Sequence, residues 1–123
     1  MLYIEDNAPN LRLLERILEH RPAIALLSAD HGLTGLELAV SRQPDLILLD
    51  LHLPDLPGRD VLARLKSDLR TRGIPVVIVT ADANPDIVDS LREAGAQEFL
   101  TKPIDVQRVL SVVDYLIAGD GAD

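Results

Sequence analysis

The sequence predicts an α/β fold, in which helices cover both faces of a doubly wound parallel β-sheet. Short apolar runs alternate with amphipathic stretches along the 123 residues. Two of these runs, LILL at 46–49 and VVIV at 76–79, are continuous, as in strands that are buried on both faces. Strands that alternate with helices indicate right-handed crossover connections and hence a parallel sheet. The chain length suits one domain.

Five apolar runs are the predicted strands, each bounded by turns. They span Leu2–Ile4, Ala23–Leu27, Leu46–Leu49, Val76–Val79 and Glu98–Leu100. For a sheet of five strands with five helices, the order 2-1-3-4-5 is one of the two common doubly wound arrangements. Composition alone does not select this order over the other doubly wound arrangement.

Amphipathic stretches predict the five helices. Pro9 suits the first turn of the first helix, and Asn84-Pro85 starts the fourth, which ends at Gly95, a residue suited to a C-cap. The last helix begins at Asp105. Apolar residues at spacings of three and four form the buried faces: Leu11, Leu14 and Leu18; Leu33, Leu36 and Val40; Val61, Leu62 and Leu65; Ile87, Val88 and Leu91; and Val106, Val109, Leu110, Val113 and Ile117.

Composition argues against several classes of function. The chain has 20 acidic and 12 basic residues and a net charge of −8, which disfavours a nucleic-acid-binding surface. It has no cysteine, which excludes disulfides, thiolate metal sites and a cysteine nucleophile. No apolar run approaches the roughly 20 residues of a membrane span, and no basic segment precedes an apolar one at the N-terminus. We therefore expect a cytoplasmic domain that contacts neither nucleic acid nor membrane.

Polar side chains follow four of the predicted strands. Glu5 and Asp6 follow the first, Asp50 the third, Thr80 the fourth and Lys102 the fifth. The carboxyl ends of parallel strands rim the ligand crevice of such a sheet, so we expect these side chains to converge. Three carboxylates and one ammonium leave a surplus of two negative charges, and crowded carboxylates repel one another unless a cation joins them. Their oxygens favour Mg²⁺, or Mn²⁺ in its place.

An acidic crevice that holds such a metal suits phosphoryl transfer. A carboxylate can accept a phosphoryl group as an acyl phosphate, and Asp50, at the end of the predicted central strand, is the candidate acceptor. Lys102 precedes Pro103, and an X-Pro bond can be cis, which would help to fix the direction of the lysine. The sequence leaves that isomer open.

These residues, in this order, resemble the receiver domain of two-component response regulators over essentially the whole chain. The motifs are YIEDN at 3–7, LILLDLHLPDLPG at 46–58, VVIVTAD at 76–82 and GAQEFLTKP at 95–103. The resemblance implies the flavodoxin-like receiver fold with strand order 2-1-3-4-5 over residues 1–118, followed by a short flexible tail at 119–123. It implies a phospho-accepting signalling domain of a phosphorelay, which assists its own phosphorylation and dephosphorylation but is not otherwise an enzyme.

The resemblance also assigns roles at the acidic crevice. It implies that Asp50 takes a phosphoryl group from a histidine kinase or a histidine phosphotransfer protein. Asp6 and the backbone carbonyl of His52 would bind Mg²⁺ directly, whereas Glu5 would act mainly through a metal-bound water. Lys102 would pair with the phosphoryl group.

Thr80 and Phe99 match the switch pair of this family. The Thr80 hydroxyl would move toward the phosphoryl oxygen, and Phe99 would turn inward into the vacated space, which makes a bistable element biased by one new charge. His52 and Asp82 lie two residues after Asp50 and Thr80, at positions that tune the phosphoryl lifetime in receivers.

Three residues are predicted partner contacts. Leu11 on the first helix would dock a histidine-bearing helix, and Val112 and Tyr115 fall off the apolar stripe of the last helix, so we expect both to be partly exposed. In receivers, the face of the fourth helix, fifth strand and fifth helix is the usual output and dimer surface. EDN at 5–7 and LHLPDLPG at 51–58 look most like receivers attached to hybrid sensor kinases, although stand-alone receivers share these features.

Three alternatives remain beside the receiver reading. A flavodoxin-like nucleotide binder would need a Gly-, Ser- or Thr-rich phosphate loop, but Glu5-Asp6 follows the first strand. A small Mg²⁺-dependent phosphohydrolase would typically need a second Asp two residues after the nucleophile, where His52 stands. A degenerate receiver that acts only as a protein-interaction module would be expected to lack the acceptor or the acid pair, and both are present.

Overall fold

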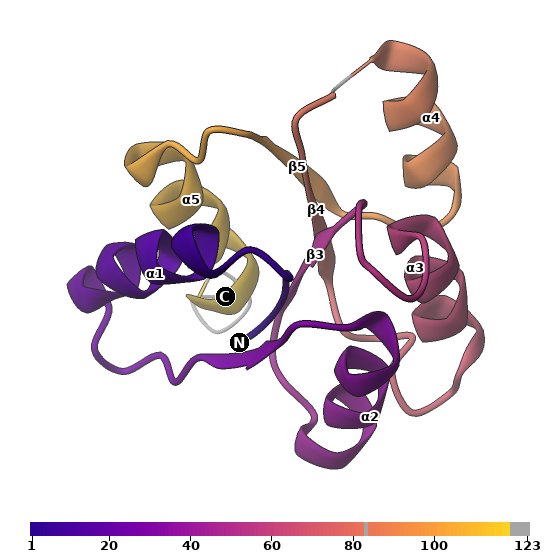
Figure 1. Cartoon of the computed structure of the whole chain (residues 1–123). Helices are drawn as coiled ribbons and strands as arrows, with labels where there is room; N and C mark the ends of the chain where they lie inside the picture. The colour runs from indigo at the N-terminus through magenta and orange to yellow at the C-terminus, as the bar shows by residue number, and fades with distance from the viewer. Residues whose placement is uncertain (83, 119–123) are drawn as a thin grey trace.

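The computed structural model describes residues 1–82 and 84–118 and contains one parallel sheet of five strands (Figure 1). The strands follow the order β2-β1-β3-β4-β5, so the doubly wound order 2-1-3-4-5 is confirmed. Their bounds are β1 Leu2–Ile4, β2 Leu27–Ala29, β3 Ile47–Asp50, β4 Val76–Thr80 and β5 Glu98–Thr101. The predicted tail at 119–123 lies outside the described residues.

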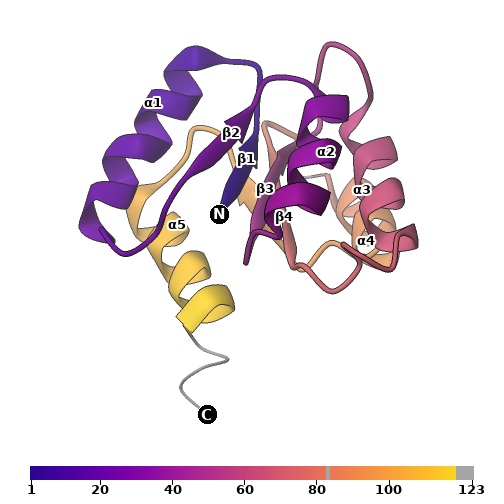
Figure 2. The same ribbon diagram turned by 90° about the horizontal axis from the view of Figure 1, so that it is seen from below.

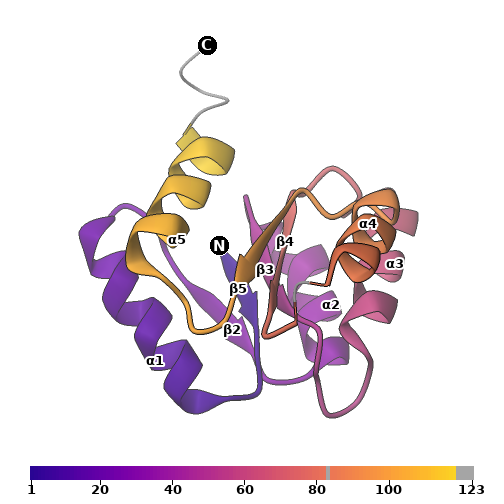
Figure 3. The ribbon, with the colours of Figure 1, turned by 90° about the horizontal axis from the view of Figure 1, so that it is seen from above.

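Helices cover both faces of the sheet. The helix α1 (Ala8–Ile17), with a short 3₁₀ turn at Leu18–His20, lies with α5 (Val106–Val113) over one face, and α5 continues as a π-helical turn at Asp114–Ala118. The helices α2 (Gly32–Arg42), α3 (Gly58–Ser67) and α4 (Pro85–Glu93) gather over the other face (Figures 1 and 3). In the part of the chain that the structure describes, no helix is long and apolar enough to cross a membrane.

Local sequence signals explain where the helices begin and end. The side chains of Asn7, Asn84 and Asp105 each accept a hydrogen bond from a backbone N–H in the first turn of α1, α4 and α5. The fourth helix stops just before Gly95, whose φ of +112° is a conformation that glycine adopts at little cost.

Two apolar cores, one on each face, explain the continuous apolar runs. In β1, Leu2 and Ile4 pack beneath α2, α3 and α4, whereas Tyr3 packs beneath α1 and α5. In β3, Ile47 and Leu49 face the first core, and Leu48 faces the second. The apolar residues of these two strands therefore enter the two cores alternately, because successive side chains point to opposite faces of a sheet.

The second strand differs from its predicted span of Ala23–Leu27, because pairing with β1 decides where it begins. The first strand is only three residues long, and its partners in register are Leu27, Ser28 and Ala29. The terminal ammonium of Met1 instead donates to the carbonyl of Ala25, 2.9 Å away. Residues 23–26 therefore approach the sheet without forming a ladder in it.

The burial of α5 also differs from prediction. Val112 is only 4% exposed, so the prediction that it is partly exposed is wrong. It follows the fully buried Val109 by three residues, and residues at that spacing share one side of a helix. Val106, expected in the buried stripe, is 38% exposed, whereas Tyr115 is exposed as predicted.

Candidate functional site

The predicted polar residues meet at the carboxyl edge of the sheet. The loops that leave β1 and β3 lie at the same edge (Figure 2), and an oxygen from each of Glu5, Asp6 and Asp50 lies within 4.8 Å of the other two. Glu5 is 4% and Asp50 2% exposed, whereas Asp6 is exposed to solvent. Two buried carboxylates and an exposed one therefore form a single cluster, as the strand ends predicted.

Lys102 reaches both buried carboxylates of this cluster. Its Nζ lies 3.4 Å from Oε1 of Glu5 and 3.4 Å from Oδ2 of Asp50. The backbone N–H of Lys102 donates to the carbonyl of Thr80 at 2.8 Å, which places the lysine directly beside the end of β4. The Lys102-Pro103 bond, whose isomer the sequence leaves open, is cis.

The neighbours of Glu5 shift its pKa in opposite directions. Burial raises the pKa of Glu5, and Asp50 raises it further. The amide Nδ2 of Asn10 donates to Oε1 of Glu5 at 2.8 Å and acts in the opposite direction, as does the charge of Lys102. Asn10 stands in the first turn of α1 and was not predicted from the sequence, where an exposed helix residue was the ordinary expectation.

The donor set fits a hard divalent cation. It consists of carboxylate oxygens with a surplus of negative charge, and the chain offers no thiolate. The side chain of His52 is exposed, and its backbone N–H donates to Oδ1 of Asp50 at 3.2 Å. That bond holds the Asp50 carboxylate from the loop side. Metal binding by the His52 carbonyl stays a prediction.

The loop after Asp50 is held close to that residue. A Cβ on Gly58 would overlap the carbonyl oxygen of Asp50 and lie 2.5 Å from the Cα of Leu51, so only glycine fits there. Further along, the carboxylate of Asp55 accepts hydrogen bonds from the N–H groups of Gly32 at 2.7 Å and Leu33 at 2.9 Å. The loop thus connects Asp50 to the N-terminus of α2, which the sequence did not indicate.

Thr80 and Phe99, the predicted switch pair, are both buried. Thr80 is 1% exposed, and its hydroxyl oxygen accepts a hydrogen bond from the N–H of Asp82 at 3.1 Å. Phe99 is buried, with the guanidinium of Arg92 5.0 Å from the ring centroid. The hydroxyl is therefore engaged by its own loop, and a move toward Asp50 would exchange that bond for another.

Two hollows flank the cluster. One of about 390 Å³ is lined by Glu5, Asp6 and the half-buried Leu11 among others. The other, of about 220 Å³, is lined by Thr80 together with His52 and Asp82, whose side chains are exposed. The predicted docking residue Leu11 thus shares a hollow with two of the carboxylates, and the predicted lifetime-tuning residues share one with Thr80.

The predicted output residues lie away from the carboxylates. Tyr115 is 76% exposed and lines a hollow with Glu98 and Arg108, at the groove between β5 and α5. Val112 lines the same hollow but is almost fully buried, so it cannot offer the contact area that was expected of it.

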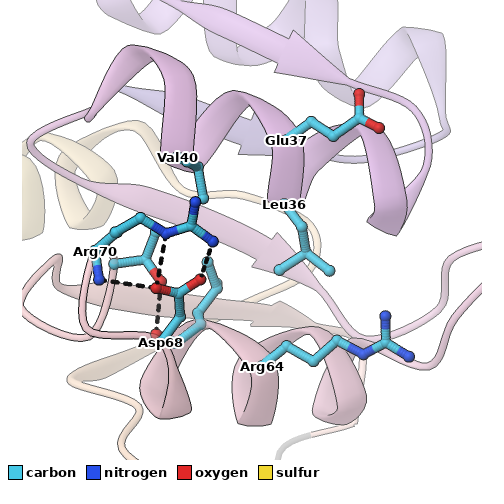
Figure 4. Close-up of a pocket in the computed structure, with 8 residues that line it drawn as sticks. Leu36, Glu37, Val40, Arg64, Asp68 and Arg70 are labelled. Carbon is cyan, nitrogen blue, oxygen red and sulfur yellow. Dashed lines mark hydrogen bonds and ion pairs between the residues drawn. The ribbon is translucent and has the colours of Figure 1, made fainter.

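A separate pocket of about 430 Å³ lies between α2 and α3 (Figure 4). Leu36 and Val40 of α2 and Arg64 of α3 are among its lining residues, and Arg70 forms an ion pair with Asp68 at 2.8 Å. This pocket shares no residue with the acidic cluster, and none of the predicted site residues lines it.

Comparison with known proteins agrees with this geometry. The model of the response regulator receiver domain family matches residues 1–114. The chain is 34% identical over 113 residues to the polar-differentiation response regulator DivK of Brucella anthropi, a match that covers 92% of this chain and 91% of that protein.

Solved structures of receiver domains have the same fold. The signal receiver domain of a signal transduction histidine kinase from Syntrophus aciditrophicus superposes with a TM-score of 0.84 and 30% identity, over 96% of this chain and 89% of that one. The receiver domain of the sensor histidine kinase PA1611 from Pseudomonas aeruginosa PAO1 has a TM-score of 0.84 and 24% identity, over 95% of both chains. That structure has a magnesium ion coordinated in its active-site cleft.

Proposed function

The chain belongs to the response regulator receiver domains, and from that premise we propose that it transmits a signal by accepting a phosphoryl group on Asp50. The donor would be a phosphohistidine of a histidine kinase or a histidine phosphotransfer protein. The observation that carries this proposal is the buried Asp50 carboxylate, which shares one sheet edge with Glu5, Asp6 and Lys102. Each of these side chains has a distinct use in phosphoryl transfer.

Glu5, Asp6 and Asp50 would hold Mg²⁺, or Mn²⁺ in its place, with Asp6 as a direct ligand and Glu5 acting mainly through water. The ion would neutralise the phosphoryl oxygens and lower the repulsion that an approaching anion meets. Burial and the neighbouring charge of Asp50 raise the pKa of Glu5, and a cation beside it acts in the opposite direction. The cluster thus has a physical need for the ion.

The transfer step uses the charges already in place. A carboxylate oxygen of Asp50 attacks the phosphorus, the P–N bond of the phosphohistidine breaks, and its electron pair stays on the imidazole nitrogen as the ring leaves. The side chain of Lys102, 3.4 Å from the acceptor carboxylate, then pairs with a phosphoryl oxygen. The result is an aspartyl phosphate whose lifetime His52 and Asp82 would tune from the adjoining hollow.

The new charge would bias the switch pair. The Thr80 hydroxyl, now bonded to the backbone of Asp82, would turn to a phosphoryl oxygen and vacate space that Phe99 would fill. We propose that this change controls a partner at the face of α4, β5 and α5, either through an effector or through a homodimer. Tyr115 is its exposed contact candidate, and Leu11 would dock the histidine-bearing helix of the donor.

The test is uptake of phosphate from a small donor. The protein is incubated with Mg²⁺ and phosphoramidate, and intact-mass spectrometry should show one added phosphoryl group that Asp50→Asn abolishes. Asp45→Asn is the matched control, because Asp45 is an exposed aspartate just before the opposite end of the same strand, and it should leave uptake unchanged. Absence of uptake with every donor would replace this proposal with the protein-interaction module.

A further inference from the structure

Asp55, in the loop between β3 and α3, caps a helix to which it does not belong. Its carboxylate accepts hydrogen bonds from the backbone N–H groups of Gly32 at 2.7 Å and Leu33 at 2.9 Å, which begin α2. The first N–H groups of a helix have no partner inside it. His31 stands at the N-cap of α2, yet its side chain makes no capping bond. Asp55 therefore takes the place of the N-cap side chain, although it lies 23 residues from Gly32 in the chain.

The N-terminus of α2 packs tightly against the loop that carries Asp55. A Cβ on Gly32 would lie 2.8 Å from Cγ2 of Val61 and 3.3 Å from the Cβ of Leu56. The backbone of α2 therefore approaches the loop and α3 more closely than a side chain at this position would allow. This packing, together with the two hydrogen bonds to Asp55, fixes the loop relative to α2.

The same loop is closed at its base by backbone contacts. The N–H of Gly58 donates to the carbonyl of Leu51 at 2.8 Å, and His52 pairs with Pro57 in an isolated antiparallel bridge. His52 therefore lies at the closed base of the loop, whereas Asp55 lies between the two sides of that base, near the tip. Because the base is closed, a tilt of the tip changes the direction in which the backbone groups of His52 point.

Both segments that Asp55 connects lead to the acidic cluster. On the loop side, the N–H of His52 donates to Oδ1 of Asp50 at 3.2 Å. On the side of α2, the preceding strand β2 ends at Ala29, whose carbonyl accepts a hydrogen bond from the N–H of Glu5 at 2.9 Å. The hydrogen bonds of Asp55 therefore connect the two sides of the carboxylate cluster through contacts outside the sheet.

We propose that Asp55 is a positioning residue of the acidic cluster, which holds the loop in the orientation that lets the His52 carbonyl bind Mg²⁺. The role rests on the proposed function. Asp55 itself is neither a metal ligand nor a contact of the phosphoryl group, and it acts through the loop. Groups that orient a metal ligand in this way typically change the metal affinity by about 10- to 100-fold when they are removed.

The test is the Mg²⁺ affinity of Asp55→Ala, measured by amide chemical shifts during a titration with the metal alone. Asp55 is exposed, so its truncation leaves the core intact. We expect the affinity to fall by about tenfold, because the loop is then free to tilt. Without metal, the amide of His52 should exchange its hydrogen faster than in the parent. Asp55→Asn keeps an oxygen that can accept at the cap, so it should retain most of the affinity.

Asp60→Asn is the matched control, because Asp60 is an exposed aspartate in the first turn of α3 and its replacement removes the same charge. Its Mg²⁺ affinity should stay close to that of the parent, since salt screens exposed charges. A lower urea midpoint for Asp55→Ala with unchanged Mg²⁺ affinity would make Asp55 a plain helix cap and overturn the role. Equal losses of affinity in Asp55→Ala and in either asparagine variant would assign the effect to lost charge and also overturn it. Absence of Mg²⁺ binding in the parent would instead overturn the proposed function, and this role with it.

Discussion

Replacement of Lys102 by methionine tests whether the acidic cluster depends on a counter-charge. The substitution preserves most of the side-chain volume and removes the ammonium that lies 3.4 Å from both Glu5 and Asp50. Their carboxylates are then buried together without a cation. We expect Lys102→Met to unfold at lower urea concentration than the parent when no divalent ion is present.

The size of this loss has an upper bound. At 3.4 Å, an effective dielectric constant of 20 gives an attraction of about 5 kcal/mol for each ion pair, part of which only offsets the desolvation of the charges. The cluster can instead take up a proton, and at pH 7 protonating a carboxyl whose usual pKa is 4.5 costs about 3 kcal/mol. The net loss should therefore be about 1–3 kcal/mol.

The sign of the pH dependence follows from the same reasoning. Burial already raises the pKa of Glu5, and loss of Lys102 raises it further, so the folded variant binds more protons than the unfolded chain. The loss of stability is therefore largest at neutral pH and shrinks as the pH falls toward the usual pKa of glutamate. Urea denaturation at several pH values would measure it.

Saturating Mg²⁺ should restore most of the lost stability, because the ion replaces the missing positive charge. The matched control is Lys66→Met, which changes the other lysine of the chain. Lys66 is half-buried and donates to the carbonyl of Ile74 at 2.8 Å. Mg²⁺ should therefore not restore the stability that Lys66→Met loses. Equal gains from Mg²⁺ in Lys102→Met and in the parent would refute the electrostatic reasoning.

Three further predictions follow from particular contacts. Thr80→Ala should still accept phosphate but show smaller backbone NMR shifts on phosphorylation, and shifts equal to those of the parent would contradict the switch assignment. Gly58→Ala should cost about 1–3 kcal/mol in urea denaturation, because its Cβ overlaps the backbone of Asp50; full stability would show that the loop yields freely. Arg70 lowers the pKa of Asp68 from its usual 3.8 to about 2, so the ion pair stabilises the fold above pH 3.8 and ceases to do so as the pH falls toward 2. Asp68→Asn should remove that part of the acid dependence in urea denaturation between pH 5 and 2, and an unaltered profile would argue against it.

Sequence reasoning predicted the acidic cluster because it used only the direction of the strands. Glu5 and Lys102 each follow a strand and Asp50 is the last residue of one, and strands that run parallel end at the same edge. The same reasoning failed for the start of β2, because a strand begins where its partner offers a ladder, and β1 has only three residues. It also misjudged Val112, since the direction of a helix face depends on what the helix packs against.

Contacts between distant segments were beyond the pattern of the sequence. In the sequence, Asn10 is only a polar residue in the first turn of a predicted helix. In the structure its side chain donates a hydrogen bond to Glu5. Asp55 reads as a loop residue, yet its carboxylate binds the N–H groups that begin α2. Neither contact can be predicted from the sequence, because each depends on how a helix is placed relative to a loop.

The sequence by itself determined the alternation of strands and helices, the family resemblance and the set of charged residues at the strand ends. These follow from periodicity and from the order of residues along the chain, which need no knowledge of distance. Only the tertiary structure decided that Lys102 is shared between Glu5 and Asp50, and that Asn10 of α1 donates to Glu5. Such facts depend on separations of a few ångströms between side chains from different elements, and packing of the whole domain sets those separations.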